Sequence, residues 1–425
     1  RDIEPVFDGP QPARAIDEIR SRLADLRTAL VHCEATERSA DMWTLLARLV
    51  NYFWYQGNLD EALDWFTRVA CIDEGTDPSA AAPGRLAAAL LATSRGDHDE
   101  IVTATEHAIR TAIAAGDRRS EGRARVLAGA HLSWRDALGG SEAIAEACVL
   151  CDETGDRLWS AWAHCGSALA LTFLGRPLDA IAELDIVVRT ARQAESRRLT
   201  MEVLARRCVA EHQLGRWGAC AATIEHGRAL AGGFAHVNVT ACFDAVDAML
   251  AIGRHGERGA VDAAGRMSEA ISRHVRAGEL QFVPWFIDAR AIALIETGSP
   301  AEAVELVRGI RGHPGLRWAS IYRHWLDHTL ARALIDLDEP AEARRVAMRL
   351  VDDAIVIGNQ LDAARGSVLL AGIDLIDGEI LEAERRAHEA LTVFVGLGAV
   401  PAALTALQVL TRTDELLGRS ARAAA

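Results

Sequence analysis

Gly57-Asn-Leu-Asp-Glu-Ala62 is the stretch that decides the fold, because variants of it recur at regular intervals along the chain. A segment rich in Leu and Ala precedes it, the glycine closes that segment, and Glu-Ala opens a second segment with helical spacing. The closing residues of eight such copies stand at positions 62, 101, 143, 180, 220, 303, 343 and 383. Most steps are close to 40 residues, and the double step of 83 predicts one more copy, in which Ala260 or Ala263 takes the position. Repetition at this period is typical of stacked helical hairpins.

Each part of the repeated stretch has a physical reason. The glycine can take the left-handed conformation that ends a helix. Pro177 and Pro300 suit the first turn of the following helix, where the missing N–H costs nothing. Behind the turn, Leu63, Phe66 and Val69 recur at helical spacing. No alternating strand pattern competes, so the sequence predicts an all-α solenoid of about nine hairpins with a period near 40 residues.

The composition excludes several classes of protein. The 425 residues carry a formal net charge of −14, and every basic residue is arginine. A phosphate-binding P-loop needs a lysine, so the chain contains none. Nucleic-acid binding needs clustered positive charge, whereas pairs such as Arg118-Arg119, Arg206-Arg207 and Arg344-Arg345 are interleaved with acids and are expected on solvated helix faces. Abundant Ala and Arg without Lys is typical of a GC-rich coding sequence, such as an actinobacterial one.

The repeat defines the expected organisation of the chain. We expect an irregular lead-in at 1–15, a capping helix region at 16–38, the array at 39–399 and a capping helix with a frayed tail at 400–425. Glycines within 232–259 mark the weakest hairpin. The chain begins at Arg1 rather than Met, so we expect a fragment of a longer protein. Eight isolated cysteines and no apolar stretch of about 18 residues indicate a cytoplasmic protein that does not span a membrane.

The first clear hairpin resembles the tetratricopeptide repeat in residue type and spacing. The matching residues are Leu46, Leu49, Phe53, Gly57, Ala62, Phe66 and Val69. The match thins elsewhere, where Thr105 and Ala147 replace the large aromatic residue, and a period near 40 rather than 34 requires longer helices or turns. Similarly stretched repeats occur in the sensor arms of large LuxR-type and maltose-activator-type bacterial transcription regulators, which this chain resembles over roughly 40–400. Other repeats of similar period, such as HEAT, fit the turn less well.

The resemblance implies a right-handed superhelix whose concave face is lined by the first helix of each hairpin. Trp162, Trp285 and Trp325 share one register position on that face. They either form a ligand-binding groove or pack as wedges between repeats. Other positions predicted to line the groove are Cys165, Asp288 and His328, then Leu169, Ile292 and Arg332, with Asn51 and Tyr55 from the first hairpin and Arg206 and His212 from the fifth.

Other chemistry is sparse in the sequence. Cys148-x-x-Cys151 has no second pair to complete a zinc site and no neighbouring βα pattern for redox chemistry. His324 and His328 have metal-binding spacing but lack the glutamate of the known motif. We therefore expect neither a cofactor, nor a metal, nor an enzyme.

The sequence predicts a sensor or interaction arm that binds a small-molecule effector or a peptide or protein partner. Its further partners would be the ATPase and DNA-binding domains of the parent regulator. A constitutive protein–protein interaction scaffold and an enzyme with an active site in the groove remain as alternatives.

Overall fold

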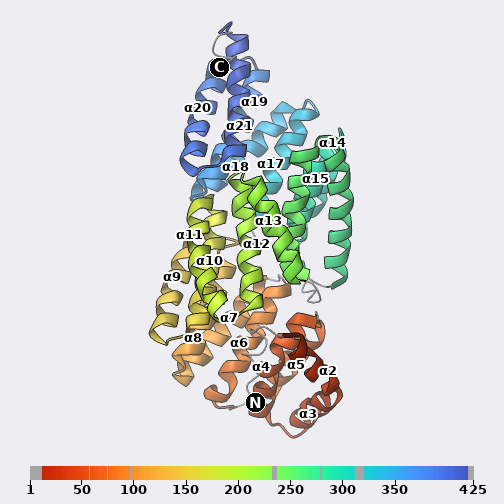
Figure 1. Ribbon diagram of the computed structural model, residues 1–425, viewed down its shortest axis with the longest axis vertical. Coiled ribbons are helices and arrows are strands. Elements are labelled where there is room, and N and C mark those ends of the chain that lie inside the picture. The colour runs from red at the N-terminus through yellow and green to blue at the C-terminus, as the bar shows by residue number, and fades with distance from the viewer. Residues whose placement is uncertain are drawn as a thin grey trace.

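A computed structural model describes residues 12–56, 58–73, 75–95, 98–231, 237–277, 280–311 and 320–419. Every regular element in these ranges is a helix, and the helices succeed one another along the long axis from the N-terminal to the C-terminal end (Figure 1). They are α2 (Pro12–Ser21), α3 (Leu23–Ala35), α4 (Ser39–Gln56), α5 (Leu59–Cys71), α6 (Pro78–Arg95), α7 (His98–Ala115), α8 (Arg118–Leu132), α9 (Ala137–Glu153), α10 (Arg157–Phe173), α11 (Pro177–Gln193), α12 (Arg197–Gln213), α13 (Trp217–Ala231), α14 (Val237–Ala277), α15 (Val283–Glu296), α16 (Pro300–Arg311), α17 (Ser320–Asp336), α18 (Pro340–Val356), α19 (Gln360–Ile376), α20 (Ile380–Leu397) and α21 (Val400–Leu416).

The helices pack as nine sequential hairpins, so the fold prediction is confirmed. Eight of the hairpins are pairs of consecutive helices. They are α4/α5, α6/α7, α8/α9, α10/α11, α12/α13, α15/α16, α17/α18 and α19/α20. The ninth is α14, in which two helices join at Gly256 with φ 55° and ψ −135°. Ala260 and Ala263 beyond that bend are fully buried, as the hidden copy requires.

A 20-residue unit of one helix and one turn underlies the period of 40. Helices α10, α11 and α12 each contain 17 residues, and three-residue turns join them. The residue before the last of each turn has positive φ, as at Gly155, Gly175, Glu195 and Gly215, and again at Asp338, Gly358, Gly378, Gly398 and Gly418. The repeated stretch seen in the sequence is therefore only every second turn. Longer helices than those of the 34-residue repeat account for the stretched period.

The turn after α10 shows how these residues end one helix and start the next. The Gly175 N–H donates to the Thr172 carbonyl at 3.1 Å, and the Arg176 N–H donates to the Leu171 carbonyl at 2.8 Å. This hydrogen-bond pair is the Schellman motif, which needs a left-handed residue at the glycine. Pro177 then occupies the first turn of α11. Turns with a left-handed residue at the equivalent position, such as those at Gly155, Glu195 and Gly215, likewise set consecutive helices antiparallel.

The third hairpin corrects the predicted register. The turn before α9 is formed by Trp134, Arg135 and Asp136 rather than by the Gly139-Gly140 pair, and Asp136 caps α9 by accepting from the Gly139 N–H. Gly140, not Ala143, is the small residue at the close helix contact, because a Cβ there would lie 2.3 Å from Ser133 Oγ. The closing residues then stand at 101, 140 and 180, which restores the period.

The N-terminal region differs from the single capping helix expected. Helix α2 begins at Pro12, inside the predicted irregular lead-in. A non-helical residue, Arg22, separates it from α3. Ile16 and Ile19 are buried, and α2 packs against α4, so both short helices cover the open end of the first hairpin. Positions 1–11, 232–236 and 420–425 of the predicted lead-in, weak point and tail lie outside the described residues.

Successive turns of the superhelix touch each other. Asn359 Nδ2 donates to the Phe173 carbonyl at 2.7 Å across 186 residues. Gly175 lies so close to Leu361 that a Cβ on the glycine would sit 2.3 Å from the leucine Cβ, and Gly215 faces Pro401 at 3.0 Å in the same way. In Figure 1 the blue helices α18–α21 accordingly stand directly above the yellow and green helices α10–α13.

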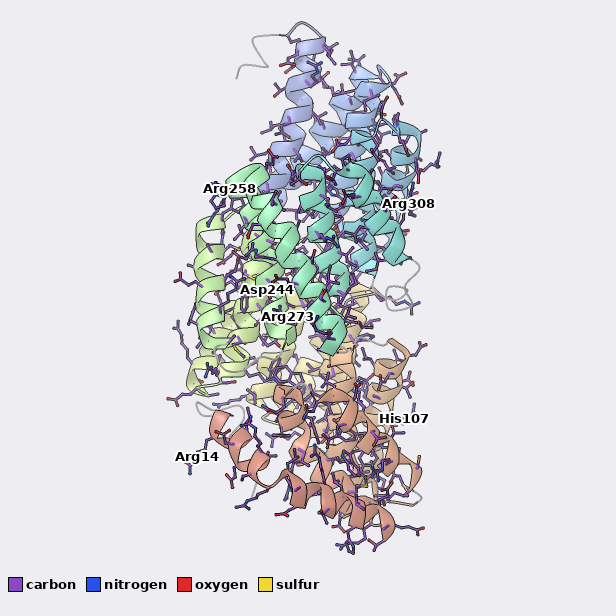
Figure 2. The ribbon with its side chains drawn as sticks, turned by 90° about the vertical axis from the view of Figure 1, so that its right-hand side faces the viewer. Arg14, His107, Asp244, Arg258, Arg273 and Arg308 are labelled. Atoms are coloured by element: carbon purple, nitrogen blue, oxygen red, sulfur yellow. The ribbon has the colours of Figure 1, made fainter. Side chains whose placement is uncertain are left out.

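Ion pairs cover much of the outside. Asp244 on α14 accepts from Arg228 at 3.0 Å and from Arg273 at 2.6 Å, and Figure 2 shows Asp244 and Arg273 together on this face. Arg118 and Arg207 also pair with acids on the surface, as the sequence predicts. No helix in the described part of the chain is long and apolar enough to cross a membrane.

Candidate ligand cavity

The inner face of the superhelix forms a partly open cavity of about 590 Å³. Its walls come from the first helices of successive hairpins, α4, α6, α8, α10 and α12, and from parts of α14, α15 and α17. This is the face that the tetratricopeptide resemblance assigns to ligands. A cavity of several hundred Å³ accommodates a small molecule of ordinary size.

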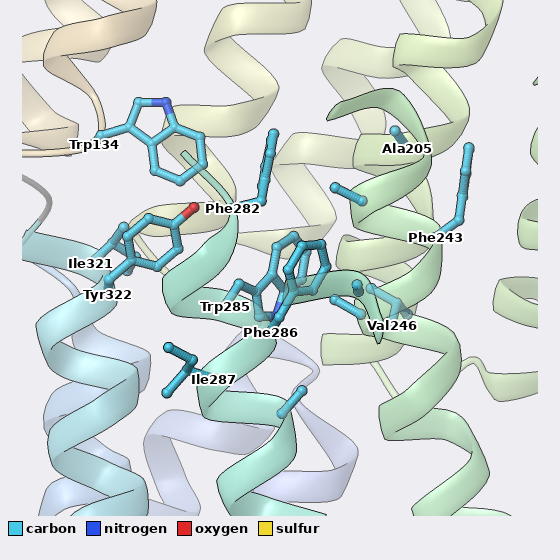
Figure 3. Close-up of a cluster of buried hydrophobic side chains, with 14 of the residues drawn as sticks. Trp134, Ala205, Phe243, Val246, Phe282, Trp285, Phe286, Ile287, Ile321 and Tyr322 are labelled. Carbon is cyan, nitrogen blue, oxygen red and sulfur yellow. The ribbon is translucent and has the colours of Figure 1, made fainter. Parts of the chain in front are cut away.

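Tryptophan dominates the cavity wall. Six of the ten tryptophans of the chain line it, namely Trp54, Trp134, Trp159, Trp162, Trp285 and Trp325. The far wall is an aromatic cluster in which the ring centroids of Trp134 and Phe173 lie 4.7 Å apart and those of Trp285 and Trp325 lie 5.4 Å apart. Figure 3 shows Trp134 from the turn before α9, Phe282 and Trp285 from the start of α15 and Tyr322 from α17 in this cluster. Offset and edge contacts of this kind hold the rings rigid.

Arg198 is the cation of the cavity. It stands on α12 and is only 9% exposed, and its guanidinium carbon lies 4.3 Å from the ring centroid of Trp54 and 5.0 Å from that of Trp162. Arg198 Nη1 donates to Asn51 Oδ1 at 3.1 Å, while its Nε has no hydrogen-bond partner. Within the described chain no carboxylate lies at ion-pair distance from it. Cation–π contacts of roughly 2 kcal/mol each offset part of the cost of this buried charge.

The other charged groups of the wall are neutralised nearby, apart from the exposed Arg48. Arg123 Nε donates to Asp156 Oδ2 at 2.7 Å, and Arg206 pairs with Glu202. Arg206 therefore lines the cavity rather than a solvated face, contrary to the expectation for paired arginines. Four arginines and one glutamate line the cavity of a chain whose net charge is −14, so the interior is locally basic.

The structure brings half of the eight principal predicted site residues into the wall. Asn51, Trp162, Trp285 and Trp325 line the cavity, and so do Leu169 and Arg206. Trp162 and Trp325 are half-buried, whereas Trp285 is only 5% exposed and belongs to the hydrophobic core. Trp285 thus combines the two roles that the sequence left open, lining and packing. Tyr55 lies in α4, but its side chain is outside the described part.

Three predicted positions point elsewhere. Asp288 is buried against α17, where it accepts from Thr329 Oγ1 at 2.6 Å. His328 is half-buried outside the cavity wall, and Arg332 pairs with Glu296 at the surface. On α10 the wall follows Trp162, Gly166 and Leu169, which is a step of four and then three residues. The sequence analysis instead took the residue three positions after Trp162, Cys165, whose side chain points away from the groove and into the contacts between helices.

Of the other positions in that pattern, Cys165 is buried within the hairpin core, Ile292 is half-buried away from the cavity, and His212 also lies outside the wall. Burial lowers the pKa of both His212 and His328 to about 4, with Arg365 adding repulsion. Burial likewise raises the pKa of Asp288 to about 7, although the Thr329 hydroxyl opposes the shift. The two histidines are therefore neutral at neutral pH, whereas Asp288 is partly protonated.

Another polar arrangement escaped the sequence analysis. Cys148 Sγ lies 3.8 Å from His164 Nε2, and His164 Nδ1 lies 2.7 Å from Glu183 Oε2. Hydrogen bonding to Cys148 and Glu183 raises the pKa of His164 to about 10 despite its partial burial. All three residues sit inside helices, so the backbone N–H groups beside the thiol are already bonded within the helix and are not free to bind an oxyanion. Because the three come from α9, α10 and α11, only the hairpin register could have joined them.

The two candidate metal patterns do not gather ligands. Cys151 is buried, and burial raises the pKa of its thiol to about 12. His324 Nδ1 lies 3.7 Å from Asp362 Oδ2, and Asp327 accepts from Arg349. Among the described residues no three histidines, cysteines or acids lie close enough together to hold a metal ion.

Comparison with solved structures gives distant matches. A Signal Transduction ATPase with Numerous Domains protein with a tetratricopeptide repeat sensor, from Pyrococcus horikoshii, is 12% identical with a TM-score of 0.44, over 89% of this chain and 60% of that one. The tetratricopeptide repeat domain of P58(IPK) is 15% identical with a TM-score of 0.25, over 94% and 98%. A circular tandem repeat protein is 12% identical with a TM-score of 0.16, over 97% and 98%. No family model and no curated protein matches.

At these values the class rests on the helices and turns of the chain itself. Sequential antiparallel hairpins, first helices on the inside and a small residue at each helix contact define a tetratricopeptide-like helical repeat protein.

Proposed function

We propose that this chain is the effector-binding sensor arm of a bacterial transcription regulator, and that its ligand occupies the aromatic cavity. The observation that carries the proposal is the tryptophan-lined cavity of about 590 Å³ between the first helices. Rigid aromatic walls supply large contact area at little entropic cost, which suits a small molecule better than an extended partner protein. The proposal assigns the chain no reaction of its own.

The closed superhelix also supplies a means of signalling. Helices that line the cavity belong to both turns of the superhelix, and the turns meet at Gly175 and Leu361. A ligand that fits one spacing of the turns better than another shifts the equilibrium between them. In the proposed regulator, that shift changes how the arm packs against the ATPase domain of the LuxR-type parent.

Two measurements test the proposal. Fluorescence of the chain reports directly on the cavity, because most of its tryptophans line the wall. Saturable quenching by a small apolar probe at one molecule per chain is expected, and a chain that binds none contradicts ligand binding. The coding sequence that flanks the chain tests the regulator. A P-loop ATPase before it and a helix-turn-helix after it are expected, and flanking sequence without them contradicts that part.

A docking scaffold is the second candidate, favoured by one surface of the last helix. Val400, Leu404 and Leu407 recur at a helical spacing of four and three on α21 and remain about half exposed. An uncovered apolar stripe of this kind is typical of a helix that packs against another protein. Replacing Leu404 and Leu407 with Glu separates the roles: association with a partner would be lost, while probe binding in the cavity would persist.

A further inference from the structure

We infer that the cavity selects small molecules that combine an apolar ring system with one negative charge, and that Arg198 and Asn51 bind this charge. The inference rests on the proposed function, since it names the class of ligand for the same cavity. Its basis is the state of Arg198, a buried cation that lines the cavity without a carboxylate partner in the described chain.

A buried arginine is normally paired, because removing a charge from water is costly. The other buried arginines of the wall obey this rule through Asp156 and Glu202. Arg198 instead lies beside the rings of Trp54 and Trp162, with an unbonded Nε. Stacking on indole faces holds the guanidinium in place but leaves its Nε–H without an acceptor. An anionic ligand would supply both the missing charge and the missing acceptor.

Asn51 strengthens the selection. Arg198 can only donate, so the Asn51 atom that accepts from it is Oδ1. The Asn51 Nδ2 group therefore remains available to donate to a ligand. No partner for that Nδ2 lies in the described chain, and Asn51 also lines the cavity. The groups of Arg198 and Asn51 that lack a partner in the described chain, Nε and Nδ2, are thus both donors. A ligand with an acceptor, and above all an anion, satisfies them, whereas a cation or a purely apolar molecule leaves them unbonded.

The remaining wall fixes the other half of the ligand. Leu86, Leu90, Leu127 and Leu169 add aliphatic surface to the tryptophans. Because Arg123 and Arg206 are already paired and Arg48 is exposed, Arg198 is the one buried arginine of the wall left to bind a negative charge. An aromatic or polycyclic monoanion therefore fits both parts of the cavity.

The test uses two fluorescent probes that differ by one group. 8-Anilinonaphthalene-1-sulfonate carries a single negative charge, and N-phenyl-1-naphthylamine is the same ring system without the sulfonate. Both are titrated into the full chain by calorimetry and by tryptophan quenching. The variants are Arg198→Gln, Asn51→Asp and, as a charge-matched control, Arg207→Gln. Arg207 lies on the same helix, but pairs with Asp185 on the outer face.

We expect one sulfonate probe per chain, with an affinity lowered roughly 10- to 100-fold by Arg198→Gln, as for loss of a charged hydrogen bond. Asn51→Asp should weaken the sulfonate similarly and raise the melting temperature, because the new carboxylate neutralises Arg198 in the free protein. The neutral probe should change less than about threefold in every variant, a difference of under 1 kcal/mol. Arg207→Gln should alter neither probe.

The outcomes separate the two claims. If both probes bind but neither variant discriminates between them, selection by charge is wrong and the ligand cavity stands. If neither probe binds at one per chain, the cavity is not a ligand site and the proposed function fails as well. If Arg198→Gln does not fold, Asn51→Asp decides, because it keeps Arg198 and its stacking on the indoles. Unchanged sulfonate affinity in that variant overturns the inference.

Discussion

The contact between superhelical turns predicts that Gly175→Ala destabilises the protein more than a similar change at another turn. Gly175 has φ 71°, and Gly378 has φ 82°, so alanine pays the left-handed penalty of about 1–2 kcal/mol at both positions. The surroundings differ. A Cβ at 378 meets nothing within 4 Å, whereas at 175 it lies 2.3 Å from Leu361 Cβ and 3.0 Å from Asn359 Oδ1. Real carbon atoms stay more than 3 Å apart, so the two turns must separate.

Separation of the turns adds an overpacking cost of about 1–3 kcal/mol at Gly175. We therefore expect Gly378→Ala to lower the free energy of unfolding by about 1–2 kcal/mol and Gly175→Ala by about 2–5 kcal/mol. Urea unfolding followed by circular dichroism measures both. Hydrogen exchange should also show faster exchange at the start of α19 in the Gly175 variant alone. Equal losses in the two variants, with unchanged exchange at α19, would refute the contact between turns.

Three further predictions concern single side chains. Burial raises the pKa of Asp288 to about 7, so the folded state keeps a proton that the unfolded state releases above its ordinary pKa. The free energy of unfolding should therefore fall by up to about 4 kcal/mol between about pH 4 and pH 7. In thermal scans Asp288→Asn should flatten that fall while keeping the Thr329 hydrogen bond. Glu195 occupies a left-handed turn position with φ 50°, so Glu195→Gly should raise the free energy of unfolding by about 1 kcal/mol, and an unchanged value would contradict the strain. Trp285 is buried in the aromatic cluster, so Trp285→Ala should lower the free energy of unfolding by about 3–5 kcal/mol. Trp162→Ala should lower it clearly less and should mainly weaken probe binding. The reverse order of the two losses would contradict the assignment of Trp162 to the cavity wall.

The sequence predicted the hairpins well because their determinants are local. A glycine or aspartate in the left-handed conformation, a proline in the next first turn and a small residue at the contact act within a few neighbours. Even the hairpin hidden in the step of 83 residues was predicted, with Ala260 and Ala263 in place. The register failed at residues 139–140, where two glycines imitate the turn but serve a close helix contact against Ser133.

The site was harder to predict because its determinants are not local. The shared register of Trp162, Trp285 and Trp325 identified the concave face. Nothing in one hairpin, however, indicates that residues 186 positions apart along the chain come into contact between successive superhelical turns. Arg198 was missed for the same reason. Its partners Asn51 and Trp54 come from the first hairpin, far away along the chain, and only the superhelical path brings them together.

The most direct test of ligand binding in the cavity is a crystal structure of the chain with 8-anilinonaphthalene-1-sulfonate bound. We expect one probe inside the cavity, with its rings against the tryptophan wall and its sulfonate against Arg198 and Asn51. A probe bound only on the outer helices, or a cavity filled by the aromatic side chains themselves, would contradict it.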